Sequence, residues 1–177
     1  MRRGFTLVEL LCLFVTLGVL ASIAFPVFSA VKRNGTRTAC ISNLRSFGQA
    51  INLYRADEGG TEVGTPPQMG LPIRVSDLTG TASLRCHGEH TGGDVPGYHM
   101  TWPDSGDKTG GKAMADWASY TSRRGPASVL LYDPNHQGPE PRSYSWQTWT
   151  VQGLRLDGGV YTHSRLGYPF SKEWWHR

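Results

Sequence analysis

An acid and three cysteines are the first residues whose chemistry stands out in this sequence of 177 residues. Glu9 immediately precedes Leu10–Val31, a run of 22 residues that contains no charge. A carboxylate at the edge of a hydrocarbon layer costs several kcal/mol unless it finds a partner. The position of Glu9 therefore predicts a functional ion pair.

The cysteines lie in two different surroundings. Cys12 is inside the apolar run, where we interpret it as a small packing residue. Cys40 and Cys86 follow the run, in a part that we expect outside the cytoplasm, where disulfides form. A bond between them would close a loop of about 45 residues and stabilise the fold by roughly 3–4 kcal/mol. Two interpretations stay open, namely this disulfide and two free thiols.

Metal-binding residues are suggested at two places, and neither makes a convincing site. The segment Cys86-His87-Gly88-Glu89-His90 offers thiolate and imidazole at short spacing, which suits zinc, but it has no evident fourth ligand. We interpret it as a polar loop and predict no metal. Acids in glycine-containing loops could hold calcium, but their spacing matches no EF-hand, so we predict no cofactor and keep calcium as the alternative. These acids are Asp94, Asp104, Asp107, Asp133 and Asp157.

Catalytic motifs give no support to an enzyme. The sequence contains no Gly-x-Ser-x-Gly, no His-Glu-x-x-His, no phosphate-binding Gly-x-x-x-x-Gly-Lys-Ser/Thr and no dinucleotide-binding Gly-x-Gly-x-x-Gly. After the apolar helix and its continuation, about 120 residues remain, which is little for a large α/β enzyme. We therefore predict that the protein is not an enzyme.

Aromatic residues could form a ligand surface for sugars or single-stranded DNA, although core packing is their commoner use. The net charge of +4 and pI of about 9.1 come without a long basic run, so nucleic-acid binding is not indicated. Only the C-terminal segment 172–177 has the composition of an exposed piece, where contact with a neighbouring subunit is a hypothesis. The aromatic residues are Tyr98, Trp102, Trp117, Tyr144, Trp146, Trp149, Tyr168, Trp174 and Trp175.

The element that must position Glu9 is the apolar run itself. At 1.5 Å rise per residue, its length is sufficient for a helix to cross a bilayer core of about 30 Å. Basic residues lie on both sides, so the flanking charge does not decide the orientation. Gly18 and Pro26 lie within the run and predict a kink or a stretch that unwinds easily.

The sequence Gly4-Phe5-Thr6-Leu7-Val8-Glu9-Leu10-Leu11, followed by Gly18 and Pro26, resembles the N-terminus of type IV pilins and type II secretion pseudopilins. In that family a prepilin peptidase cuts after the glycine and N-methylates the new terminal Phe. The resemblance implies cleavage between Gly4 and Phe5, N-methylation of Phe5, and pairing of Glu9 with the terminal amine of a neighbouring subunit.

The same resemblance implies a location and a set of partners. The chain would pass once through the inner (cytoplasmic) membrane with its N-terminus in the cytoplasm and its globular domain outside, and would then move into a helical filament. The expected partners are other copies of the chain, the prepilin peptidase, an assembly ATPase and a membrane platform protein.

Elementary electrostatics agrees with this assignment. Cleavage after Gly4 leaves a cation on Phe5, and an acid four residues along can neutralise such a cation in a water-poor filament core. The positive end of the helix dipole also favours an acid there. The alternative is a secretory signal peptide cut before Phe25, in which Glu9 would be poorly placed within the apolar region.

The helix is expected to continue past the membrane segment. Cys40, Leu44, Phe47, Ile51 and Tyr54 recur at spacings of 4, 3, 4 and 3, which predicts one buried helical face. Asp57-Glu58-Gly59-Gly60 ends the pattern with a charged turn and glycines.

The rest of the chain indicates a small sheet. We predict strands at Val129–Tyr132 and Tyr144–Val151, and a hairpin in which Asp157-Gly158 forms a two-residue turn. The order of motifs weakly resembles prepilin-type proteins in which nine residues separate a His from an Asp-Gly pair. Here that position is Gln147 and His136 lies too far upstream, so no site residue is carried over.

The sequence thus predicts an α+β, pilin-like fold, in which a long N-terminal helix packs its second half on a small antiparallel sheet. The expected segments are a leader at 1–4, an apolar helix at 5–31, its amphipathic continuation at 32–58 and a β-rich domain at 59–177. The predicted function is a structural subunit of a type IV pilus-like or type II secretion filament. The alternative is a secreted or membrane-anchored module that binds sugar, DNA or calcium.

Overall fold

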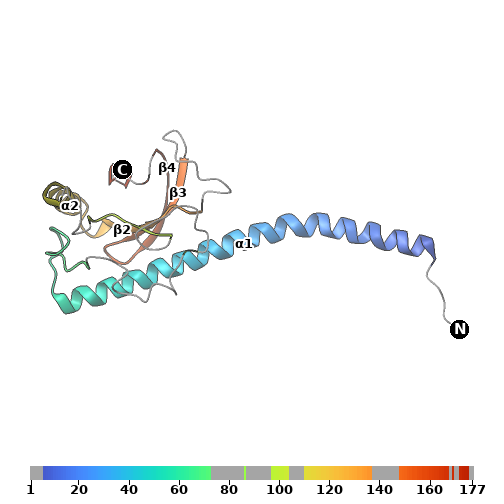
Figure 1. The fold of residues 1–177 in the computed structure, drawn as a ribbon, viewed down its shortest axis with the longest axis horizontal. Coiled ribbons are helices and arrows are strands. Elements are labelled where there is room, and N and C mark those ends of the chain that lie inside the picture. Colours follow the sequence, from blue (N-terminus) through green and yellow to red (C-terminus); the bar gives the residue numbers. More distant parts are fainter. Residues whose placement is uncertain are drawn as a thin grey trace. The chain divides into compact units, whose positions relative to one another are not determined.

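The computed structural model describes residues 6–72, 86, 97–103, 110–136, 148–167, 169 and 172–175. The chain divides into two compact units, Met1–Gly35 and Thr36–Arg177, which are described separately below. The elements, drawn in Figure 1, are α1 (Leu7–Glu58), β1 (His99–Met100), α2 (Gly110–Arg124), the 3-10 helix η2 (Gly125–Ala127), β2 (Val129–Asp133), β3 (Thr148–Arg155), β4 (Val160–Leu166) and the 3-10 helix η3 (Lys172–Trp175).

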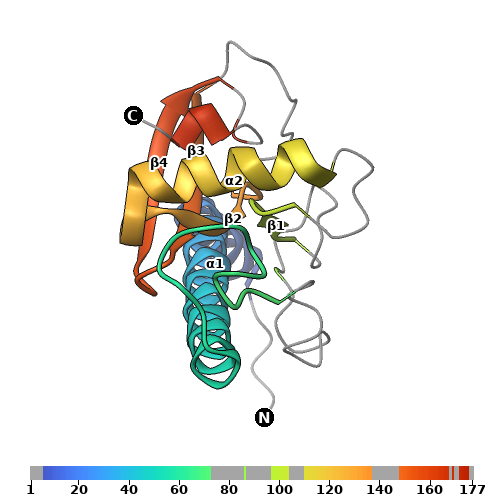
Figure 2. The same cartoon turned by 90° about the vertical axis from the view of Figure 1, so that its left-hand side faces the viewer.

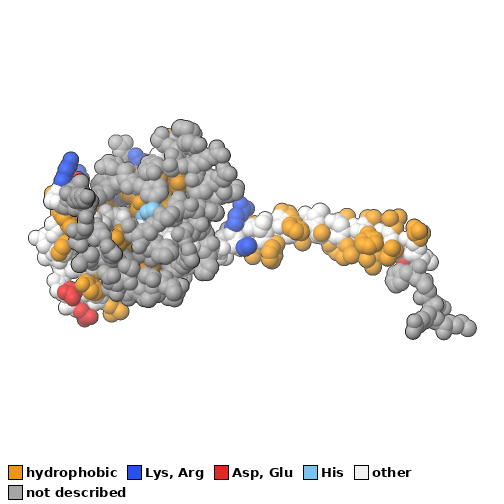
Figure 3. Space-filling view, viewed as in Figure 1, with side chains coloured by type: hydrophobic (Ala, Val, Ile, Leu, Met, Phe, Trp, Pro, Cys, Tyr) orange, Lys and Arg blue, Asp and Glu red, His pale blue; other side chains and the backbone are white. Residues whose placement is uncertain are grey.

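The N-terminal stretch of α1 is an uncovered apolar helix. Its large apolar side chains from Leu7 to Val31 are between 43% and 80% exposed, and Figure 3 shows such side chains along this stretch. By length and composition, α1 contains one segment suited to crossing a membrane. The helix is continuous through Gly18 and Pro26, and a bend of its axis at these residues stays a prediction.

The second unit is built on a four-stranded antiparallel sheet in the order β1-β2-β3-β4. The predicted strand at Val129–Tyr132 is confirmed as β2, all of whose residues are buried. The strand predicted at Tyr144–Val151 begins in the structure at Thr148 and continues to Arg155. Residues 144–147 lie outside the described part.

The β3–β4 hairpin is confirmed, but its predicted two-residue turn is wrong. The Gly158 N–H donates to the Arg155 carbonyl at 3.0 Å, and the Arg155 N–H donates to the Gly159 carbonyl at 2.8 Å, so the loop contains three residues. Only its last residue, Gly158, needs the left-handed region, with φ of 81°. Asp157 stabilises the loop because its Oδ1 accepts the Gly159 N–H at 2.8 Å.

One face of the sheet packs on the amphipathic part of α1, as the periodicity predicts. Cys40, Leu44, Phe47 and Ile51 are fully buried, whereas Tyr54 at the end of the stripe is partly exposed. Burial of each large apolar side chain, such as Leu44, Phe47 or Ile51, stabilises the fold by roughly 1.5–3 kcal/mol. This face therefore fixes where Cys40 lies against the sheet.

The other face of the sheet is covered by the C-terminus. Trp174 and Trp175 are 3% and 2% exposed and pack with Val129, Tyr132 and Trp149 in a second core cluster. The expectation of an exposed segment at 172–177 is therefore wrong for these two tryptophans, because the sheet has a second apolar face that needs a cover. Residues 176 and 177 lie outside the described part.

Helix α2 was not predicted from the sequence. Its Trp117, Tyr120 and Thr121 are buried at helical spacing, and the Tyr120 hydroxyl accepts the Val129 N–H at 2.7 Å. In Figure 2, α2 runs across the view, while the C-terminal end of α1 points toward the viewer. The helix begins with two glycines, and glycine pairs in a sequence normally indicate a loop.

Candidate functional site

Glu9 belongs to a capping box at the start of α1. Thr6 precedes the first helical residue, Leu7, and its backbone N–H and its hydroxyl both donate to Glu9 Oε2 at 2.9 Å. In return, the Glu9 N–H donates to Thr6 Oγ1 at 3.3 Å. This reciprocal pattern satisfies backbone donors that the first turn of a helix otherwise leaves without partners.

The capping box leaves the charge of Glu9 at the solvent-facing end of an apolar helix. Glu9 is exposed, and hydrogen bonds from Thr6 orient its carboxylate without neutralising it. An arriving cation would thus meet an oriented acid. Gly4 and Phe5, where we expect cleavage and N-methylation, lie outside the described residues.

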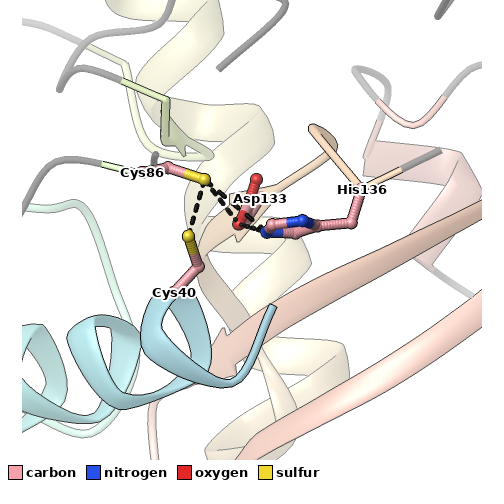
Figure 4. A group of neighbouring side chains, drawn as sticks. All are labelled: Cys40, Cys86, Asp133 and His136. Carbon is pink, nitrogen blue, oxygen red and sulfur yellow. Dashed lines mark hydrogen bonds and ion pairs between the residues drawn. The ribbon is translucent and has the colours of Figure 1, made fainter. Parts of the chain in front are cut away.

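A second group of reactive side chains lies in the core of the globular unit. One ligand atom each from Cys40, Cys86, Asp133 and His136 lies within 4.8 Å of every other in this set. Figure 4 shows the four side chains converging on one place. Cys86 Sγ is 2.7 Å from Cys40 Sγ, 3.4 Å from Asp133 Oδ2 and 3.6 Å from His136 Nε2. Asp133 Oδ2 also forms an ion pair with His136 Nε2 at 3.0 Å. We call these four residues the Cys-Asp-His cluster.

Three separate parts of the fold position the Cys-Asp-His cluster. Cys40 is on the buried stripe of α1, Asp133 is the last residue of β2, and His136 follows three residues later. Cys86 comes from the chain between α1 and β1, and the close approach of Gly97 fixes its place. A Cβ on Gly97, whose φ is 84°, would lie 2.4 Å from Cys86 Cβ, so only glycine fits there.

Asn135 holds the carboxylate of Asp133 in place. The backbone N–H and the side-chain amide of Asn135 both donate to Asp133 Oδ1 at 2.9 Å. The same amide donates to the Gly97 carbonyl at 2.6 Å. Oδ1 is therefore engaged by Asn135, and Oδ2 is left to face Cys86 and His136.

The electrostatics of the Cys-Asp-His cluster favours charged groups. The hydrogen bond between Cys40 and Cys86 lowers the pKa of the Cys40 thiol to about 5, against the opposing effect of burial. Burial disfavours a charged His136, but hydrogen bonds to Asp133 and Cys40 outweigh it and raise the pKa of His136 to about 9. Both shifts have the same origin, since each charge is stabilised by an oppositely charged or hydrogen-bonding neighbour in the interior.

The structure brings together Cys40 and Cys86, as the disulfide hypothesis requires. Their sulfur atoms lie 2.7 Å apart as two thiols, so the two interpretations, a disulfide and two free thiols, both stay open. Asp133 and His136 join them in the structure, although sequence reasoning did not predict it. The local signal that could have found them is the Asp-x-x-His spacing at the end of the predicted strand.

The other predicted site residues do not come together in the part of the chain that the structure describes. Asp133 is fully buried at the end of β2, so the expected loop position is wrong for it, whereas Asp157 is in an exposed turn as expected. Cys12 is exposed on α1. Residues outside the description are His87, Glu89, His90, Asp94, Asp104 and Asp107.

The proposed aromatic ligand surface is contradicted for the described residues. Each of the named tryptophans and tyrosines in the described part is at most 3% exposed, because it packs inside one of the two core clusters. The buried residues are Tyr98, Trp102, Trp117, Trp149, Trp174 and Trp175, whereas Tyr144, Trp146 and Tyr168 lie outside the description.

A long apolar helix that continues across a small antiparallel sheet is a pilin-like α+β arrangement. Comparison with curated proteins agrees with this class. The chain is 38% identical to type II secretion system core protein G of Klebsiella pneumoniae over 74 residues, which are 40% of this chain and 53% of that protein. It is 38% identical to the core protein G of Pectobacterium carotovorum over 56 residues, 32% of this chain and 36% of that protein.

A pilus protein is also among the relatives. The chain is 30% identical to type IV major pilin protein PilA of Myxococcus xanthus over 91 residues, which are 48% of this chain and 41% of that protein. The chain thus spans between about a third and a half of the length of these relatives. No family model and no solved structure matches the chain.

Proposed function

We propose that the protein is a structural subunit of a filament of the type IV pilus or type II secretion kind. The observation that carries this proposal is the N-terminal part of α1, an exposed apolar helix that begins with an oriented acid, Glu9. A soluble protein does not leave so long an apolar surface uncovered. In a membrane and then in a filament core, lipid tails or neighbouring helices would cover it.

The proposed course of assembly follows from the N-terminal residues. Prepilin peptidase cuts between Gly4 and Phe5 at the cytoplasmic face of the membrane, and Phe5 is N-methylated. The new terminal cation of one subunit pairs with Glu9 of its neighbour, since both charges are costly in an apolar core unless they are paired. An assembly ATPase and a platform protein would supply the work of extraction, and local unwinding near Gly18 and Pro26 would ease it.

The names of the relatives support this proposal and favour no enzymatic alternative. They are a secretion system core protein and a major pilin. The second hypothesis, a binding module for sugar, DNA or calcium, loses its main support because the described tryptophans are buried. We therefore do not propose it further.

A pair of alanine variants in the native host tests the proposal. Glu9→Ala should leave leader cleavage largely intact but keep the protein in the membrane fraction, out of the sheared filament fraction. Glu58→Ala, which removes an exposed acid from the other end of α1, is the matched control and should enter filaments normally. Normal incorporation of Glu9→Ala would contradict the proposed pairing.

A further inference from the structure

We propose that Cys40, Cys86, Asp133 and His136 form a binding site for one divalent metal ion, and that zinc is the metal that this site favours. The proposal is independent of the filament function. It starts from the convergence of four ligand atoms, contributed by α1, the segment before β1 and the end of β2, at one buried place (Figure 4).

The donor set selects the kind of metal. Two sulfurs, one imidazole nitrogen and one carboxylate oxygen are ligands that zinc accepts in four-coordinate sites. Calcium and magnesium take oxygen ligands almost exclusively, so two thiols argue against both. A set of four protein ligands leaves no position for water or substrate, which is typical of a structural site.

Three of the six distances between ligand atoms are close to those of a tetrahedral site. With metal–sulfur bonds of about 2.3 Å and metal–nitrogen or metal–oxygen bonds of about 2.0–2.1 Å, neighbouring ligand atoms lie about 3.3–3.8 Å apart. Cys86 Sγ is 3.4 Å from Asp133 Oδ2 and 3.6 Å from His136 Nε2, and Asp133 Oδ2 is 3.0 Å from His136 Nε2. The two sulfurs, at 2.7 Å, would have to separate by about 1 Å to ligate one ion.

Burial and supporting contacts also fit a structural metal. Cys40 and Asp133 are fully buried, Cys86 is 1% exposed, and the side chain of His136 is 10% exposed. Asn135 engages Asp133 Oδ1 and so directs Oδ2 into the Cys-Asp-His cluster. Hydrogen bonds of this kind orient the ligands of metal sites and raise their affinity.

Binding requires proton release and no redox change. The ion would displace to solvent every proton that the two sulfurs still carry, together with the second ring proton of His136, so that a neutral imidazole ligates through one nitrogen. Two thiolates and one carboxylate then carry three negative charges against the two positive charges of the ion. The buried carboxylate of Asp133 would thereby gain a permanent cation beside it.

A disulfide between Cys40 and Cys86 is the competing state. It would account for the nearness of the two sulfurs, but it gives no reason for Asp133 and His136 to point at the same place. Oxidation would also remove both thiolates as ligands. The two states therefore exclude each other. Zinc content and free thiols, measured on the same purified protein, distinguish them.

The test uses the full chain, purified in detergent without chelators and equilibrated with Zn²⁺. Zinc content is measured by elemental analysis, and thiols are counted by alkylation after denaturation in acid, together with the intact mass. We expect one zinc ion per chain and alkylation of all three cysteines. Two other results would overturn the proposal. One is a zinc-free chain with a single alkylated cysteine and a mass lower by two hydrogen atoms, and the other is three thiols without bound zinc.

A matched pair of histidine variants then tests the ligand assignment. His136→Gln should weaken zinc binding, measured in competition with a chelator of known affinity, by at least about tenfold. His163→Gln changes a histidine on β4 that is not in the Cys-Asp-His cluster. This variant should bind zinc with the same affinity as the unsubstituted protein. Substitution with Co²⁺ should give thiolate-to-metal charge-transfer absorption in the unchanged chain. Equal zinc affinity of both variants would contradict the assignment of His136.

Discussion

Thr6 and Glu9 hold each other at the first turn of α1, with the amide and the hydroxyl of Thr6 each 2.9 Å from the same carboxylate oxygen of Glu9. The acid expected to recruit a neighbouring subunit therefore has a second task, which is to cap the helix that carries it. The two tasks use different properties of Glu9, because capping needs an acceptor oxygen and recruitment needs a charge.

Variants of Thr6 and Glu9 should separate these tasks. Glu9→Gln keeps an acceptor oxygen for the capping box but loses the charge, so we expect it to be cleaved and capped but absent from filaments. Thr6→Ala keeps the charge but loses the cap, which should cost about 1 kcal/mol of helix stability while filaments still form. Hydrogen exchange at the first turn of α1 measures the cap, and the sheared filament fraction measures incorporation. Filaments built from Glu9→Gln would show that charge is not needed.

Gly48 sets how closely α1 approaches the sheet. A Cβ at this position would lie 2.9 Å from Cδ1 of Leu154, whose side chain is fully buried. Gly48→Val should therefore lower the free energy of unfolding by about 1–3 kcal/mol through overpacking. Gly35→Val is the control, since a Cβ there has no neighbour within 4 Å. Urea unfolding of the chain in detergent measures both, and equal midpoints would contradict the close packing.

The Tyr120 hydroxyl should stabilise the start of β2. Tyr120→Phe leaves the buried N–H of Val129 without the oxygen that now accepts it at 2.7 Å, which should cost about 1–3 kcal/mol. Tyr54→Phe, at a partly exposed ring, should change the unfolding midpoint little. A neutral effect of Tyr120→Phe would mean that another acceptor replaces the hydroxyl.

Alkaline pH should destabilise the globular unit. Burial raises the pKa of Tyr161 to about 12, although the guanidinium of Arg155, 4.3 Å from the ring centre, acts in the opposite direction. In the unfolded chain this phenol loses its proton near pH 10. Between these two pKa values the unfolded state binds fewer protons, so stability is complete below about pH 10 and falls as pH rises toward about 12.

Burial also raises the pKa of Tyr98 and Tyr120, so their effect has the same sign. Unfolding midpoints measured from about pH 8 to about pH 11 should decline, and Tyr161→Phe should make the decline shallower. The same slope in both proteins would show that Tyr161 titrates normally in the folded state.

The sequence predicted those features that have a local pattern. The stripe from Cys40 to Ile51 follows helical spacing, and the Asp157-Gly158 pair marks a hairpin, so the sequence alone predicts both. Helix α2 was missed because the residues that it buries are few, and because it begins with glycines that normally mark loops.

The Cys-Asp-His cluster could not be predicted in the same way. Its members come from positions 40, 86, 133 and 136, and only folding of α1 against β2 brings them within 4.8 Å. A search of the sequence for metal ligands favours residues at short spacing, such as Cys86 to His90, and overlooks ligands that tertiary packing assembles. The buried Trp174 and Trp175 were misjudged for a related reason, since the second apolar face of the sheet was not evident from the strands alone.

The mass of the N-terminal peptide of the protein, isolated from its native cell envelope, tests the central claim most directly. A subunit of a pilus-like filament should begin with N-methylated Phe5 and retain the apolar helix that follows. A chain that begins at Phe25, or one that keeps Met1 in the filament fraction, would contradict the proposed assembly and leave Glu9 without the role assigned to it.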